Sequence, residues 1–230
     1  YDGSPSDVKP VWELNRHQYF VILAEAFYLS GDRAYLDELI AQWLDWIEEN
    51  PYRIGINWAS PLEIGTRLIS WTLAYQFIET YLSKKDRTTI VLSLWQQSSF
   101  LSSHLSVDKI VRTNHLIGEA AGLFVAASSF AFQESEKWIV KAHRILEEEI
   151  RTQVFTDGVV KEQSSSYQLF DIDFFLIAYV KGAHSDRRFS AEYSELLLKS
   201  IRCLHVLQTP DHRLPLFGDG DDGRGFRLRE

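Results

Sequence analysis

Eight amphipathic segments follow one another along the 230-residue chain, and their spacing is the strongest constraint on its fold. Apolar residues recur at intervals of three and four, which indicates helices rather than strands. The predicted helices span about 11–29, 35–47, 61–81, 87–105, 114–132, 135–153, 164–182 and 190–208. They pair into four helical hairpins that start about fifty residues apart. Such a period predicts stacked hairpins, in an open solenoid or a closed all-α toroid.

The connectors before the later hairpins are polar, at residues 55–60, 112–115 and 157–166. In a toroid of hairpins the loops at one end converge on a central cleft, so these connectors are predicted to share one rim. No convincing strand pattern occurs before residue 210. Residues 1–210 are therefore predicted to form one helical domain.

The overall charge argues against a general nucleic-acid binder. The chain has 32 acidic and 24 basic residues and a formal charge of −8, whereas nucleic-acid binding requires a basic surface. An acidic protein can still bind an anionic sugar in a locally basic cleft. Its 7 Trp, 10 Tyr and 14 Phe residues are side chains that can stack on sugar rings. No run of about 18 apolar residues is present, so no membrane-spanning helix is predicted.

The stretch from Asp157 to Phe170 combines a turn, a polar cluster and an apolar helix. Asp-Gly favours a turn, and the serines at 164–166 offer capping oxygens. Tyr167 is in helical register with the apolar face, beside Glu162 and Gln163. A phenol in such a place is suited to proton transfer. The alternative is a core tyrosine whose hydroxyl binds a capping serine.

A second candidate cluster begins the fifth predicted helix with Asn114 and His115, followed by Glu119. Asn114 is a possible N-cap, and His115 and Glu119 are neighbours at i, i+4. The cluster is either a capped helix start or an amide and an imidazole directed into the cleft. Small residues at 118, 120–122 and 126–127 predict close approach to a neighbouring helix.

A third cluster surrounds the start of the third predicted helix. Glu63 and Arg67 have the spacing of a helix ion pair, beside Asn57 and Trp58. The functional interpretation is that Arg67 binds a substrate carboxylate while Trp58 stacks on a sugar ring. Glu13 with Arg16 or His17 repeats this pattern in the first helix.

The tail at 211–230 is rich in Asp and Gly, which indicates an irregular loop. It lacks the terminal Glu of an EF-hand, and the chain has no phosphate-binding loop, nucleophile elbow or His-Glu-x-x-His motif. We therefore predict no metal and no cofactor. The tail is predicted to be a linker toward a further domain.

Five motifs together resemble the helical domain of the heparinase II/III-like family of polysaccharide lyases, which includes alginate lyases. They are Trp12-Glu-Leu-Asn-Arg16; Asn57-Trp58-Ala-Ser60-Pro-Leu-Glu63 with Arg67; Asn114-His115-Leu-Ile-Gly-Glu119; Asp157-Gly158 with Glu162-Gln163-Ser164 and Tyr167; and Pro215-Leu-Phe-Gly218-Asp219-Gly-Asp221. The resemblance implies an incomplete α/α toroid followed by a β-sandwich domain, with the active site between them. It also favours the periplasm or secretion.

By motif match, the resemblance implies that Tyr167 is the catalytic tyrosine and that Asn114 and His115 contact the substrate carboxylate and transfer protons. The family also draws a histidine from the β-sandwich domain, which we expect to follow residue 230. The remaining residues expected to contact an acidic polysaccharide are Trp58, Asn57, Arg67, Glu119, Glu162, Gln163 and Arg16.

β-Elimination suits these residue types. Removing the proton beside a uronate carboxylate requires stabilisation of the developing charge, which Asn114 and a protonated His115 can provide. A base must reach the ring proton and an acid the leaving oxygen, and Tyr167 can serve in both roles. Two other functions stay open. One is a glycoside hydrolase that uses two of Glu63, Glu119 and Glu162, and the other is a non-catalytic carbohydrate-binding protein.

Overall fold

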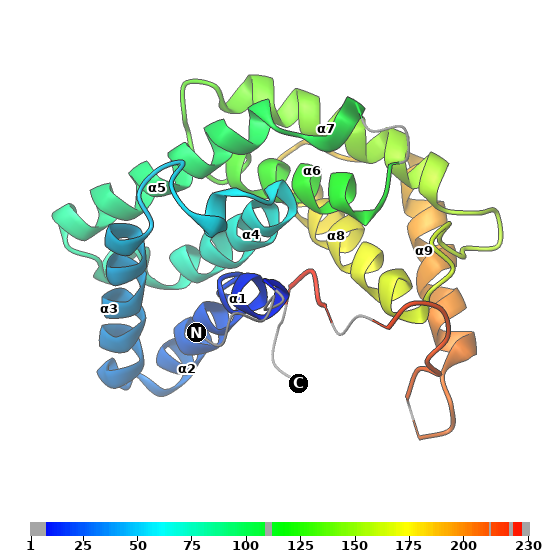
Figure 1. Ribbon diagram of the computed structural model, residues 1–230, viewed down its shortest axis with the longest axis horizontal. Coiled ribbons are helices and arrows are strands. Elements are labelled where there is room, and N and C mark those ends of the chain that lie inside the picture. The colour runs from blue at the N-terminus through cyan, green and yellow to red at the C-terminus, as the bar shows by residue number, and fades with distance from the viewer. Residues whose placement is uncertain (1–7, 109–111, 212, 221–222, 227–230) are drawn as a thin grey trace, which may run out of the picture.

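The helices form an open arch, with α2 and α3 at one end and α8 and α9 at the other (Figure 1). The computed structural model describes residues 8–108, 112–211, 213–220 and 223–226. Its α-helices are α1 Lys9–Leu14, α2 Gln18–Ser30, α3 Arg33–Glu49, α4 Pro61–Ile78, α5 Lys84–Ser103, α6 Asn114–Ala127, α7 Ser135–Gln153, α8 Ser165–His184 and α9 Ala191–Leu207. Three 3₁₀-helices are η1 Ile56–Trp58, η2 Glu79–Tyr81 and η3 Ser106–Asp108.

Four antiparallel hairpins build the arch, as the periodicity predicted. They are α2–α3, α4–α5, α6–α7 and α8–α9. The first helices of successive hairpins pack side by side, α2 against α4, α4 against α6 and α6 against α8. Their partners α3, α5, α7 and α9 form a second row. Because α2, α4, α6 and α8 run in the same direction, their N-termini lie on the same side of the arch.

Glycines set the distance between α4 and α6. A Cβ atom on Gly65 would lie 2.7 Å from the backbone oxygen of Gly118, and one on Gly122 would overlap the backbone of Gly65. The two backbones therefore touch directly. The small residues of the fifth predicted helix do permit the close approach expected of them.

The prediction of one continuous helix over residues 11–29 is wrong, because the helix is broken at residues 15–17 into α1 and α2. His17 has a left-handed backbone with φ of 52°. The break turns Arg16 and His17 into the interior, where His17 stacks on Phe20 and accepts a hydrogen bond from Trp71 Nε1 at 2.9 Å. Burial, together with the charge of Arg67, lowers the pKa of His17 well below its usual value. His17 is therefore neutral.

The fifth predicted helix also ends earlier than expected, at Ala127 rather than near Phe132. Ser128 is its C-cap residue. Phe130 then packs against Tyr75, and Phe132 packs against Trp138. These ring contacts direct the connector across the ends of two helices instead of continuing α6.

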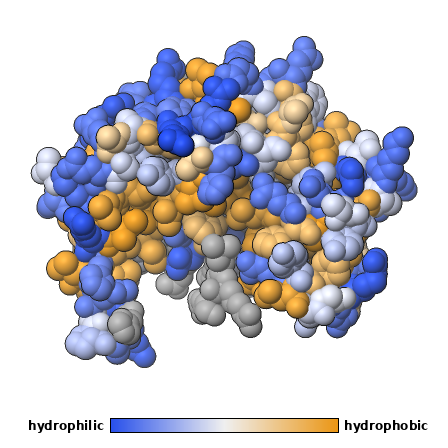
Figure 2. All heavy atoms as spheres, turned by 180° about the vertical axis from the view of Figure 1, so that it is seen from behind, coloured by the Kyte–Doolittle hydropathy of each residue, from blue (hydrophilic) through white to orange (hydrophobic). Residues whose placement is uncertain are grey.

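The described residues contain no strand, only an isolated antiparallel bridge between Val154 and Val160. The all-α prediction is confirmed for that part of the chain. None of its helices is long and apolar enough to cross a bilayer. Figure 2 shows hydrophilic residues along the upper edge of the molecule and apolar residues across the middle of this face.

Replacing Gly122 with Ala tests the contact between α4 and α6. The added methyl group would meet the Gly65 backbone, which cannot rotate away. We expect the free energy of unfolding to fall by about 1–3 kcal/mol or more, as for other overpacked cores. Urea denaturation measures this loss. Gly220→Ala, whose Cβ would have ordinary contacts beyond 3.5 Å, is the control, and equal stability of the two variants would contradict the packing argument.

Candidate functional site

Asn114 and Glu162 join the start of α6 to the loop that precedes α8. Glu162 accepts hydrogen bonds from the Asn114 backbone N–H at 2.7 Å and from Asn114 Nδ2 at 3.1 and 2.9 Å. A carboxylate is stabilised at a helix N-terminus, where backbone N–H groups and the helix dipole favour negative charge. Two of the three predicted polar connectors therefore meet at this point.

Thr113, rather than Asn114, is the N-cap of α6, and its Oγ1 accepts from the backbone N–H of His115 at 3.4 Å. Asn114 is instead the first helical residue, which leaves its side chain available to Glu162. His115 follows in the first turn and is half-buried. Glu119 is fully buried and accepts from Ser106, from its backbone N–H at 2.6 Å and its Oγ at 2.7 Å. Glu119 thus fastens the segment between α5 and α6.

Tyr167 lies in the first turn of α8, half-buried, and Ser164 is the N-cap of this helix. The phenol of Tyr167 donates to Asp219 Oδ2 at 3.2 Å. The capping serine binds the backbone N–H of Tyr167 and not its hydroxyl. Gln163, just before the cap, is exposed and has a left-handed backbone with φ of 50°. The start of α8 thus presents a phenol and an amide near the α6 start.

The Asp157-Gly158 turn that precedes this loop forms as predicted. Gly158 has φ of 96°, and its backbone N–H donates to the Phe155 carbonyl at 2.9 Å. Gln168 from α8 spans the turn, donating to the Gly158 carbonyl and accepting from the backbone N–H of Val160, both at 2.8 Å. The turn is therefore fixed to the helix that carries Tyr167.

Arg16 forms a buried ion pair with Glu63, which corrects the predicted pairing of Glu63 with Arg67. Arg16 Nε donates to Glu63 Oε2 at 2.7 Å, and a second guanidinium nitrogen donates to Oε1 at 2.9 Å. The guanidinium also lies 5.7 Å from the ring centre of Phe170 on α8. Arg16 thereby joins the starts of α2, α4 and α8.

Arg67 has no exposed surface, which leaves it none with which to contact a polysaccharide. It donates to Gln97 Oε1 at 2.7 Å and to the carbonyl oxygens of Asn15 and Asn57 at 3.2 and 3.0 Å. Burial lowers the pKa of Arg67 to about 9, although Glu63 acts in the opposite direction. Arg67 stays charged at neutral pH and holds the break between α1 and α2.

Asn57 and Trp58 are also buried, at 6% and 5% exposure. Asn57 Nδ2 donates to Asn15 at 3.1 Å and to Asn50 at 2.7 Å. Trp58 packs edge-on against Tyr52 and Phe100. In this arrangement the predicted stacking residue and its neighbour are part of the interior that supports the rim.

Asp171 is a buried acid that the sequence analysis did not single out. It lies one turn after Tyr167, is 1% exposed, and its Oδ1 has no hydrogen-bond partner among the described residues. Burial raises the pKa of Asp171 well above its usual value, and the charges of Glu162 and Glu149 add to that shift. Its carboxyl group therefore keeps its proton to a higher pH than an exposed aspartate does. An aspartate between Phe170 and Ile172, in the apolar stretch of α8, was the available signal.

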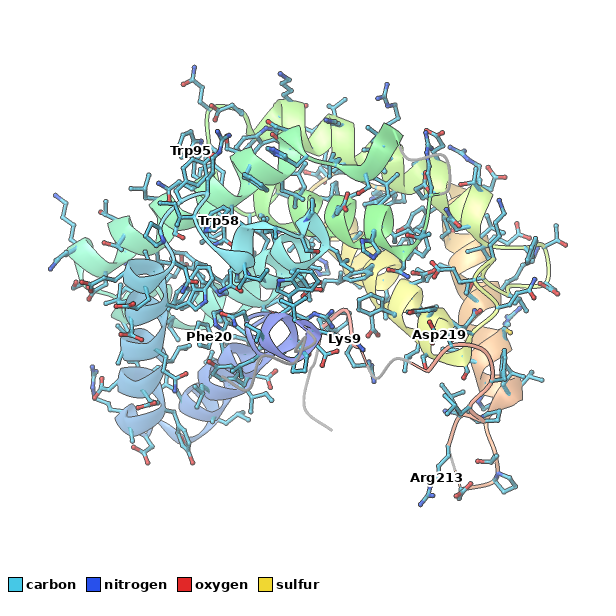
Figure 3. The ribbon with its side chains drawn as sticks, in the orientation of Figure 1. Lys9, Phe20, Trp58, Trp95, Arg213 and Asp219 are labelled. Atoms are coloured by element: carbon cyan, nitrogen blue, oxygen red, sulfur yellow. The ribbon has the colours of Figure 1, made fainter. Side chains whose placement is uncertain are left out.

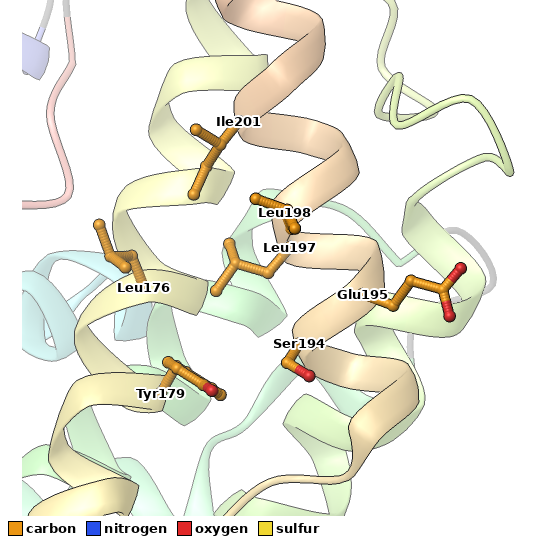
Figure 4. Close-up of a pocket in the computed structure, with 7 residues that line it drawn as sticks. All are labelled: Leu176, Tyr179, Ser194, Glu195, Leu197, Leu198 and Ile201. Atoms are coloured by element: carbon orange, nitrogen blue, oxygen red, sulfur yellow. The ribbon is translucent and has the colours of Figure 1, made fainter.

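The apolar groove between α8 and α9 does not suit an anionic sugar. It has a volume of about 430 Å³ and is lined by Leu176, Tyr179, Ser194, Glu195, Leu197, Leu198 and Ile201 (Figure 4). No cation among them can pair with a uronate carboxylate. In the part of the chain that the structure describes, no three His, Cys, Asp or Glu side chains are grouped as metal ligands would be.

The Heparinase II/III N-terminus family matches residues 4–228 of the chain. The chain belongs to this family. A heparin-sulfate lyase of Pedobacter heparinus is 29% identical, with 95% of this chain and 34% of that protein covered. A heparin-sulfate lyase of Bacteroides thetaiotaomicron is 27% identical, with 95% and 33% covered. This family member thus spans about a third of the length of the curated relatives it matches.

Solved structures of the family share the fold. A crystal structure of heparinase III superposes with a TM-score of 0.76 at 25% identity, covering 92% of this chain and 33% of that one. The heparan sulfate lyase HepC from Pedobacter heparinus gives a TM-score of 0.69 at 27% identity, covering 95% and 35%. The family resemblance and the predicted helical toroid fold are therefore confirmed.

Removing Glu63 tests the buried ion pair. Glu63→Ala leaves the Arg16 guanidinium buried without its carboxylate, so we expect a loss of about 3–5 kcal/mol in unfolding free energy. Glu13→Ala is the matched control, because Glu13 lies 4.0 Å from the same guanidinium but is 40% exposed. An exposed pair contributes about 1 kcal/mol or less. Equal losses in urea denaturation would show that burial does not strengthen the Glu63 pair.

Replacing Asp171 with Asn tests the buried acid. Below about pH 4, Asp171 is protonated in both the folded and the unfolded chain, so its ionisation does not lower the stability of the fold. As the pH rises, the unfolded chain loses the proton while the fold retains it, so stability falls until the raised folded pKa is reached. Asn has no such proton, so the variant should gain relative stability as the pH rises above about 4. Parallel stability curves would contradict this, and exposed Asp45→Asn is the control.

Proposed function

We propose that this chain is the helical part of a polysaccharide lyase that cleaves uronate-containing acidic polysaccharide by β-elimination. Support comes from the convergence of Asn114, His115 and Tyr167 at the aligned starts of α6 and α8, with Glu162 joining the two starts. The curated relatives are named heparin-sulfate lyases. Heparin- or heparan-sulfate-like chains are the favoured substrates, and alginate-like chains are the second choice.

Each residue type has a defined part in this proposal. The Asn114 amide is 6% exposed and donates to Glu162 in this structure. In the proposal it turns to the substrate carboxylate and binds it together with a protonated His115, so that negative charge can develop there in the transition state. The phenolate form of Tyr167 takes the proton from the carbon beside the substrate carboxylate, and the phenol so formed gives that proton to the leaving oxygen. Glu162 holds Asn114 in place, and exposed Gln163 contacts the sugar.

The buried candidates act through others in this proposal. Arg16 holds the starts of α2, α4 and α8 together, and Arg67 with Asn57 fixes the bend beside them. Glu119 and Trp58 fill the interior under the same rim. The proposal retains the downstream β-sandwich domain, with its histidine, as the partner that completes the site.

A glycoside hydrolase is less well supported, because it needs two carboxyl groups that flank the scissile bond. Glu63 is buried and holds Arg16, and Glu119 is buried and holds Ser106. Glu162 holds Asn114. All three candidate carboxylates are thus engaged with protein groups.

A panel of uronate polymers tests the proposal. The protein, in the longest form its gene encodes, is incubated with each polymer while the ultraviolet absorbance of the unsaturated product end is followed. Tyr167→Phe should lower turnover by about 10²-fold or more, as expected for loss of a proton-transfer group, without unfolding the chain. Tyr179→Phe, on the same helix, should be fully active.

The alternatives give different results in this assay. Cleavage without new absorbance would identify a hydrolase, and binding without cleavage would identify a carbohydrate-binding protein. Full activity of Tyr167→Phe would remove Tyr167 from the mechanism.

A further inference from the structure

The tail segment, defined here as residues 213–220 and 223–226, passes below the arch from α9 toward α1 and α2 (Figure 1). It lies against the start of α8. The Ser165 backbone N–H donates to the Phe217 carbonyl at 3.2 Å, and the Phe217 N–H donates to Ser165 Oγ at 3.3 Å. Ser164 Oγ donates to the Asp219 carbonyl at 2.6 Å. The two serines therefore bind the tail segment as well as begin the helix.

Gly218 makes this close approach possible. It has φ of 72°, and a Cβ atom there would lie 2.6 Å from the Gln163 carbonyl oxygen and 2.8 Å from Ser164 Cα. No other residue type combines that backbone conformation with so little space. The tail segment is thus shaped to the loop beside Tyr167.

A second anchor fixes the far end of the tail segment. Arg224 donates to both oxygens of Asp173 on α8, at 2.9 and 3.3 Å, and the Gly225 N–H donates to Asp173 at 3.1 Å. Gln18 Nε2 on α2 donates to the Arg224 carbonyl at 2.6 Å. The tail segment therefore connects the two ends of the arch on the side where Tyr167 lies.

Between these anchors, Asp219 reaches the start of α8 (Figure 3), with Oδ2 3.2 Å from the Tyr167 hydroxyl. We infer that Asp219 is a positioning residue for Tyr167. The tail segment holds Asp219 beside the phenol, and the Asp219 carboxylate fixes the direction of the phenolic O–H. Its catalytic importance rests on the proposed lyase function, whereas the contact itself does not.

The carboxylate has an electrostatic consequence for the phenol. Ionisation of Tyr167 would place two negative charges 3.2 Å apart, so Asp219 favours the neutral phenol. Among the described residues, the other ionisable groups around this helix start are the acids Glu162 and Asp171, the Arg16–Glu63 and Arg224–Asp173 pairs, and His115. A substitution of Asp219 alone isolates its own effect from theirs.

Tyrosine absorbance against pH tests the contact without requiring activity. Subtracting the titration of Tyr167→Phe from that of the unsubstituted chain isolates the ionisation of Tyr167, and the same subtraction is made in the Asp219→Asn background. We expect Asp219→Asn to lower the midpoint of Tyr167 ionisation by about one pH unit, because a like charge has been removed. Asp211→Asn, in the same region but bound to Thr209, should leave the midpoint unchanged. An unchanged or higher midpoint in Asp219→Asn would overturn the inference.

Kinetics test the catalytic part. If the protein is a lyase, Asp219→Asn should lower kcat at least tenfold with little change in KM, because the phenol is misdirected rather than the substrate lost. Gly218→Ala, which displaces the tail segment, should have the same effect. A shifted Tyr167 midpoint together with unchanged kcat would remove Asp219 from catalysis. Absence of lyase activity would contradict the proposed function but leave the titration result standing.

Discussion

The direct backbone contact between α4 and α6 is the constraint on which the rest of the arch depends. Gly65, Gly118 and Gly122 leave no room for a side chain there, so the backbones of α4 and α6 are in direct contact. The neighbouring inner helices α2 and α8 then pack outward from this pair. All four helices run in the same direction, so their N-termini lie on one side of the arch. The positive ends of the helix dipoles and the capping residues lie there too. The polar residues of the candidate site are assembled by this shared direction.

Charged groups buried beneath these N-termini hold the helix starts in position. The Arg16–Glu63 pair and the Arg67 hydrogen bonds lie where the chain turns from α1 into α2. A buried guanidinium needs hydrogen-bond partners, and both residues find them on other elements of the fold. These contacts fix the positions of the helix starts relative to one another. A site built from several helices depends on those positions.

The tail segment adds a restraint from outside. Its hydrogen bonds to Ser164, Ser165 and Asp173 run along one side of α8, and Gln18 ties it to α2. The sequence predicts this segment to be an irregular Asp/Gly-rich loop, and the hydrogen bonds hold it against the candidate site. Whether it also leads into a further domain stays a prediction. In the structure, the tail segment also contacts Tyr167.

The sequence by itself determined the helices, their pairing and the turn at Gly158, because apolar periodicity, caps and glycine conformation are local properties. It also predicted the small-residue contact of α6. Only the tertiary structure decided which charges meet. Glu63 and Arg67 have ideal spacing on one helix, yet Glu63 pairs with Arg16 and Arg67 with Gln97. Buried donors and acceptors need hydrogen-bond partners, and the tertiary structure supplies these from other segments of the chain. The sequence analysis did not single out Asp171, and it named Asp219 only within a motif, because the surroundings of both come from segments distant along the chain.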